Sequence, residues 1–125
     1  MFATPKRGAK ILVVDDEPTV RRFVVAALQS NGFTVLQASS GQEGLKYFAE
    51  HDDVDLILSD VLMPTMSGPE MVQRIMKSNN VKVIFMTGGD PDKKLMELSG
   101  KKYSLLHKPF TADTVLKSVQ DCLVS

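Results

Sequence analysis

The chain has 125 residues, a length that fits a single domain with a core of its own. Fifteen basic and fifteen acidic side chains give a formal net charge of zero, so there is no whole-chain electrostatic case for binding nucleic acid or an anionic membrane. The single cysteine, Cys122, excludes an internal disulfide, and no apolar run approaches the roughly 20 residues that span a bilayer. We expect a cytoplasmic protein with a disordered tail at residues 1–8 and one folded domain at residues 9–125.

Short apolar runs alternate with amphipathic segments along the whole chain. Strands are predicted at residues 11–14, 33–38, 55–59, 81–86 and 103–107. Helices are predicted to begin at Pro18, after Ser40, after Ser67, at Asp90-Pro91 and after Thr111. Five such units are too few for an eight-unit barrel. We therefore expect a flavodoxin-like α/β fold, a doubly wound five-stranded parallel sheet in the order 2-1-3-4-5 with five helices.

Local signals define the helix ends and the faces expected to enter the core. The S-x-x-E pattern at Ser40 and Ser67 is typical of a capping box, and Gly100 is expected to end the fourth helix. Apolar residues recur at helical spacing on each helix. The residues expected to be buried are Val20, Phe23, Val24, Ala27 and Leu28 on the first helix; Leu45, Phe48 and Ala49 on the second; Met71, Val72, Ile75 and Met76 on the third; Leu95, Met96 and Leu98 on the fourth; and Val115, Leu116, Val119, Cys122 and Leu123 on the last.

Polar side chains follow four of the five predicted strands. Asp15 and Asp16 come after the first strand, Asp60 after the third, Thr87 after the fourth and Lys108 after the fifth. The carboxyl ends of parallel strands share one edge of the sheet, so these groups should gather there. In the predicted order the first and third strands are neighbours, which would place the three aspartates in one crevice.

Three adjacent carboxylates need either raised pKa values or a cation, because two unit charges about 4 Å apart repel by roughly 4 kcal/mol at an effective dielectric near 20. An all-oxygen site on a wet rim suits Mg²⁺. Lys108 and Thr87 add a cation and a hydroxyl for an anion, and the set fits phosphoryl transfer onto a carboxylate. Pro109 is a candidate for a cis peptide bond that would aim Lys108 inward. Taken singly, each of these groups has a plain reading as a helix cap, a turn residue or a solvated charge.

The motifs around these groups resemble the receiver domain of two-component response regulators, over residues 9–123. They read Val13-Val14-Asp15-Asp16-Glu17-Pro18, Ser59-Asp60-Val61-Leu62-Met63-Pro64-x-Met66-Ser67-Gly68, Phe85-Met86-Thr87-Gly88 and Lys108-Pro109-Phe110. The segments at residues 86–89 and 108–111 are similar to receivers attached to hybrid sensor histidine kinases.

The resemblance implies that Asp60 accepts a phosphoryl group from a phosphohistidine on a histidine kinase or a histidine phosphotransfer protein. It implies that Mg²⁺ is held by Asp16, Asp60 and the backbone carbonyl of Leu62, with Asp15 acting through water. It also implies that Thr87 and Lys108 contact the phosphoryl oxygens. The expected role is a cytoplasmic phosphoprotein in a two-component phosphorelay, a monomer or weak dimer whose aspartyl phosphate switches partner binding.

One position departs from the family pattern. Receivers usually carry an aromatic residue three positions before the lysine, coupled to the threonine as a switch. Here that position is Leu105, and the nearest aromatic residue, Tyr103, lies two positions earlier. The switch is therefore expected to involve Thr87 together with Leu105 packing or the short helix that follows Asp90.

Two other classes of protein remain as alternatives. A haloacid-dehalogenase-like phosphohydrolase also uses a nucleophilic aspartate, but it needs a second aspartate two positions later, where this chain has Leu62. A receiver-like interaction module would use no phosphate at all. We expect no enzyme activity beyond self-phosphorylation and self-dephosphorylation. Ser125 comes directly after the last predicted helix, so the chain either signals by direct contact or belongs to a longer protein.

Overall fold

The computed structural model describes residues 8–90, 92–97 and 103–125. Its strands are β1 (Lys10–Val14), β2 (Thr34–Ala38), β3 (Leu56–Asp60), β4 (Lys82–Thr87) and β5 (Ser104–His107). The helices are α1 (Pro18–Gln29), α2 (Gly41–Glu50), α3 (Gly68–Met76), α4 (Lys93–Glu97) and α5 (Ala112–Val124). All strand pairs are parallel, and the sheet order is β2-β1-β3-β4-β5. The predicted flavodoxin-like α/β fold is confirmed.

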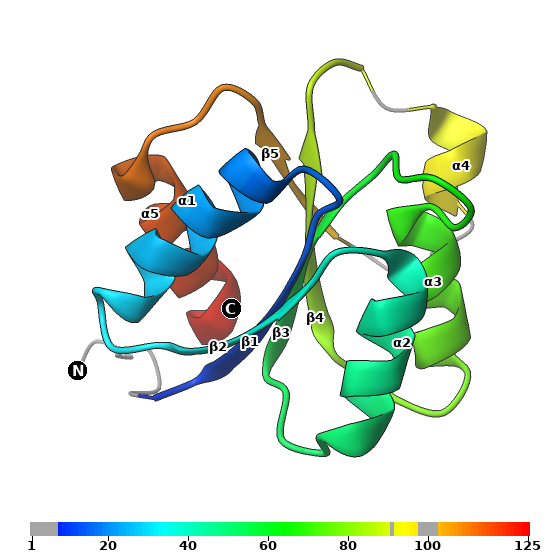
Figure 1. The fold of residues 1–125 in the computed structure, drawn as a ribbon, viewed down its shortest axis with the longest axis horizontal. Coiled ribbons are helices and arrows are strands. Elements are labelled where there is room, and N and C mark those ends of the chain that lie inside the picture. The colour runs from blue at the N-terminus through cyan, green and yellow to red at the C-terminus, as the bar shows by residue number, and fades with distance from the viewer. Residues whose placement is uncertain (1–7, 91, 98–102) are drawn as a thin grey trace.

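The sheet lies between two layers of helices, with α1 and α5 on one face and α2, α3 and α4 on the other (Figure 1). Successive residues of a strand point to opposite faces, so Ile11 and Val13 pack in the α1/α5 layer while Leu12 and Val14 pack in the layer beneath α2 and α3. All four are fully buried. This two-sided burial explains why the central strands read as continuous apolar runs.

Four of the helices begin where the sequence predicts them, and α4 does not. The first, α1, begins at Pro18 without a side-chain capping hydrogen bond from Glu17. The hydroxyls of Ser40, Ser67 and Thr111 each accept a hydrogen bond from the amide three residues later. The predicted start of α4 at Asp90-Pro91 is wrong, because the carboxylate of Asp92 accepts hydrogen bonds from the amides of the two residues Lys94 and Leu95. Pro91, Leu98 and Gly100 lie outside the described residues, as do residues 1–7 of the predicted tail.

The predicted buried faces are correct in outline but fail at the helix edges. Phe23 is 44% exposed and stacks on Phe110, with ring centroids 6.3 Å apart, while Val25 takes the buried place beside Val24. Ala49 is exposed. The exposure of Phe23 differs from the prediction because helical periodicity identifies an apolar face but not how far the neighbouring layer of the structure covers it. None of the described helices is long and apolar enough to cross a bilayer.

Candidate functional site

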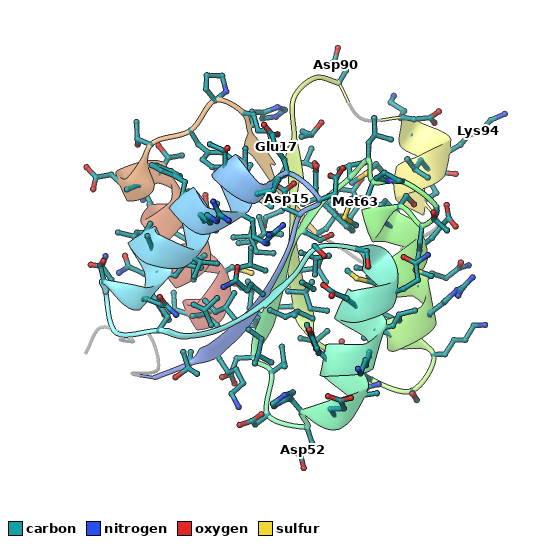
Figure 2. All side chains as sticks on the ribbon, viewed as in Figure 1. Asp15, Glu17, Asp52, Met63, Asp90 and Lys94 are labelled. Carbon is teal, nitrogen blue, oxygen red and sulfur yellow. The ribbon has the colours of Figure 1, made fainter. Side chains whose placement is uncertain are left out.

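The carboxyl ends of β1, β3, β4 and β5 meet at one edge of the sheet and bring the predicted site residues together. Asp60 and Thr87 are the last residues of β3 and β4, while Asp15 and Lys108 directly follow β1 and β5. Carboxylate oxygens of Asp15, Asp16 and Asp60 all lie within 4.8 Å of one another. Figure 2 shows Asp15 and Glu17 at this end of the molecule, with Asp52 at the opposite end. The expected clustering of the three aspartates is therefore observed.

Lys108 brings a positive charge to the same cluster. Its Nζ lies 3.4 Å from Oδ2 of Asp60 and 3.7 Å from Oδ2 of Asp15. Its backbone amide donates a hydrogen bond to the carbonyl of Thr87 at 2.8 Å, which ties the β5–α5 loop to the end of β4. The Lys108–Pro109 peptide bond is cis, as predicted. Lys108 thus offsets part of the repulsion between the two aspartates that it faces.

Asp15 is fully buried and only partly satisfied. Its Oδ1 accepts a hydrogen bond of 2.9 Å from the amide of Glu17, whereas Oδ2 has no hydrogen-bond partner among the described residues. Burial raises the pKa of Asp15 above its ordinary value of 3.8, against the opposing effects of the Glu17 amide and the Lys108 charge. A buried carboxylate oxygen that accepts no hydrogen bond is costly, and a hard divalent cation with oxygen ligands is a natural partner for it. The donor set therefore fits Mg²⁺.

Asp60 has the most perturbed carboxyl group of the site. Burial, and then the neighbouring charge of Asp15, raise the pKa of Asp60 from 3.8 to about 6, and Lys108 and the amide of Val61 oppose the rise. Its Oδ1 accepts a hydrogen bond of 3.0 Å from that amide. A carboxylate with a raised pKa is more basic than usual, which favours attack on an electrophile once a cation holds it ionised.

The pKa of Asp60 predicts how the stability of the metal-free protein depends on pH. Between 3.8 and about 6 the folded state binds more protons than the unfolded state, so the free energy of unfolding falls as pH rises through this window. In an Asp60→Asn variant the side chain at this position does not titrate, so its free energy of unfolding does not fall with pH for this reason. After allowance for solvent screening the variant should be more stable than the wild type by roughly 1 kcal/mol above the window and equal to it below. Urea unfolding in EDTA at the two ends of the window tests this, and a difference that does not change with pH would contradict it.

Thr87 and Leu62 border a cavity of about 450 Å³ that also reaches Asp60 and Leu95. The Thr87 hydroxyl donates to the carbonyl of Gly89 at 2.8 Å and accepts from the Gly89 amide at 3.3 Å. It is therefore engaged with the β4–α4 loop. Leu62 is 72% exposed.

The two residues at which the sequence departs from the family pattern, Leu105 and Tyr103, are both partly exposed. Leu105 is 36% exposed and Tyr103 is 38% exposed. The Tyr103 ring packs edge-on against buried Phe85, with ring centroids 5.3 Å apart. This edge-to-face contact holds the Tyr103 ring against β4.

Sequence reasoning missed two residues that support the site. Gly68, the first residue of α3, packs directly on the backbone of Asp60. Its position in the motif that follows Asp60 is the sequence feature that could have indicated this contact. Arg21 of α1 donates a hydrogen bond from Nη1 to the carbonyl of Asp15 at 2.8 Å. Nothing in the sequence distinguishes Arg21 from its neighbour Arg22, which is exposed.

Comparison with known proteins defines the class to which this fold and site belong. The sequence profile of the response regulator receiver domain matches residues 11–120. The chain therefore belongs to the response regulator receiver domain family, a family of signalling domains.

Individual relatives agree with this assignment. The chain is 38% identical over 119 residues to the sensor kinase CckA of Brucella abortus, covering 93% of this chain and 13% of the relative. It is 34% identical over 121 residues to the probable transcriptional regulator ycf27 of Cyanidium caldarium, covering 94% and 47%. The chain thus spans less than half the length of either relative. The structure of the chemotaxis protein CheY4 of Vibrio cholerae superposes with a TM-score of 0.83 at 35% identity, covering 92% of this chain and 98% of that one.

Proposed function

We propose that the chain is the phosphoacceptor of a two-component phosphorelay and that Asp60 takes the phosphoryl group. The observation that carries this proposal is the position of the Asp60 carboxylate, which shares one rim with Asp15, Asp16 and the Lys108 amine. In the step, an Asp60 oxygen bonds to the phosphorus of a phosphohistidine and the phosphorus–nitrogen bond breaks. The leaving imidazole nitrogen keeps the electron pair and takes up a proton, and an acyl phosphate remains on Asp60.

The chain's own residues position the phosphoryl group and balance its charge. Bound Mg²⁺ would neutralise phosphoryl oxygens, and Asp16, Asp60 and the backbone carbonyl of Leu62 are the proposed ligands, with Asp15 acting through water. Lys108 already lies 3.4 Å from Asp60, so its ammonium is placed to stabilise negative charge that grows on the transferred group.

Phosphorylation adds roughly −1.5 to −2 charges beside Lys108 and Thr87. We propose that the Thr87 hydroxyl leaves Gly89 and donates to a phosphoryl oxygen instead, which releases the β4–α4 loop. The two hydrogen bonds between Thr87 and Gly89 support this route. With Leu105 exposed and Tyr103 held against Phe85, the loop that leads to α4 carries the change to the surface.

The proposed donor is a phosphohistidine on a histidine kinase or a histidine phosphotransfer protein. The similarity to the receiver segments of proteins named as sensor kinases supports this choice. We propose that residues 9–125 form the receiver domain, that it acts in the cytoplasm, and that its reaction after phosphorylation is self-dephosphorylation.

Intact-mass measurement after incubation with a small acyl phosphate tests the proposal. With Mg²⁺ the chain should gain the mass of one phosphoryl group, and in EDTA it should gain none. No gain in Mg²⁺ would favour a receiver-like interaction module that uses no phosphate. Steady hydrolysis of an exogenous phosphate monoester, which cannot phosphorylate Asp60 as an acyl phosphate does, would favour the phosphohydrolase.

A further inference from the structure

Three of the four polar atoms of Asp15 form hydrogen bonds with other residues. Its amide donates to the carbonyl of Ala38 at 3.1 Å, which extends the pairing of β1 with β2 by one residue. Its Oδ1 accepts from the amide of Glu17, and its carbonyl accepts from Arg21 at 2.8 Å. Oδ2 alone remains without a hydrogen bond among the described residues, and it faces Lys108 at 3.7 Å.

Arg21 makes one of these contacts from another element, and it is itself held in place. The residue is half-buried in the first turns of α1, and its Nε donates to Oε1 of Gln37 on β2 at 3.3 Å. The planar guanidinium offers its donors in a fixed fork, so bonding Gln37 with one nitrogen directs another toward the Asp15 carbonyl. Lys108 is the cation that faces the Asp15 carboxylate, whereas Arg21 contacts the main chain.

The Asp15 carbonyl belongs to the peptide unit that joins Asp15 to Asp16. This unit is planar, so fixing its oxygen also fixes the direction in which the chain enters Asp16. Asp16 is exposed and lies in a loop, and it contributes an oxygen to the acidic cluster. Partners that orient a ligand from outside the coordination sphere commonly set metal affinity.

We infer that Arg21 is a positioning residue, which acts through the Asp15 carbonyl to hold the Asp15–Asp16 loop in the geometry that binds the cation. The inference rests on the proposed function, because it assumes that the acidic cluster binds Mg²⁺.

The test compares Mg²⁺ affinity, measured by calorimetric titration of metal-free protein, in a series of variants. Arg21→Met keeps the aliphatic stem and loses both donors, and it should weaken Mg²⁺ binding by about tenfold. Arg21→Lys has a single ammonium that cannot reproduce the fork, and it should weaken binding by about threefold. Arg22→Met and Arg22→Lys alter the exposed neighbour and should bind as the wild type does.

Two further readouts separate positioning from folding. Hydrogen exchange of the Asp15 and Glu17 amides in EDTA should be faster in Arg21→Met than in Arg22→Met, because the loop has lost an anchor. Wild-type Mg²⁺ affinity in Arg21→Met, or equal losses in the Arg22 variants, would overturn the inference. Should Arg21→Met fail to fold, Arg21→Lys against Arg22→Lys decides in the same way. Failure of the wild-type chain to bind Mg²⁺ would instead refute the proposed function.

Discussion

Replacing Lys108 with methionine is expected to slow phosphate uptake by Asp60 about 100-fold, because one preorganised group that stabilises the transition state is lost. The ammonium of Lys108 lies 3.4 Å from Asp60 and 3.7 Å from Asp15, so its positive charge competes with a metal ion for the same two carboxylates. Mg²⁺ affinity should therefore move in the opposite direction and become about tenfold tighter, since the carboxylates lose a competing cation.

A variant that merely unfolds would lose both phosphate uptake and Mg²⁺ affinity, so a slower uptake together with tighter Mg²⁺ binding separates the role of Lys108 from a loss of structure. Lys117→Met is the matched control, because Lys117 is a surface lysine with a side chain 79% exposed that pairs with Asp121 along α5. It should leave both the uptake rate and the Mg²⁺ affinity unchanged. An uptake rate in Lys108→Met equal to the wild type, or a parallel loss of rate and Mg²⁺ affinity, would contradict the role assigned to Lys108.

Replacing Gly68 with alanine is expected to lower the free energy of unfolding by about 3 kcal/mol, the upper range for overpacking a tight site. A Cβ at this position would collide with the carbonyl oxygen of Asp60 and lie 2.9 Å from Oγ of Ser59. The Gly68 amide also donates to the carbonyl of Val61 at 2.9 Å, so the start of α3 cannot move away without losing a bond to the loop after Asp60.

Gly88→Ala provides the comparison for stability. A Cβ on Gly88 meets no atom within 4 Å, so this change should shift urea unfolding by less than about 0.5 kcal/mol. Unfolding curves of the two variants in EDTA measure the difference directly. Equal stability of Gly68→Ala and Gly88→Ala would show that the close approach of α3 to Asp60 is not a constraint.

The sheet order and the clustering at its rim were predictable because both follow from general rules of parallel sheets. The carboxyl ends of strands share one edge, so Asp15, Asp60 and Thr87 could be placed together without any knowledge of side-chain packing. Helix starts at Ser40 and Ser67 were equally predictable, since a capping hydroxyl acts within four residues.

Features that depend on contacts between distant segments were not predictable. The exposure of Phe23 depends on where the layer formed with α5 ends, and the choice of Asp92 over Asp90 as the cap of α4 depends on the path of the loop. The contact of Arg21 with the Asp15 carbonyl joins a helix to a loop through a side chain, and no periodic pattern encodes it. The hydrogen bonds of Thr87 to Gly89 likewise arise from the conformation of one loop.

The central claim is that Asp60 carries the phosphoryl group, and the most direct measurement is the position of that group on the chain. After incubation with acyl phosphate and Mg²⁺, borohydride reduction converts an aspartyl phosphate to homoserine, which peptide mass spectrometry can assign to one residue. We predict homoserine at position 60 in the wild type and no phosphate uptake in Asp60→Asn. Conversion at another position, or uptake at the same site by Asp60→Asn, would contradict the account.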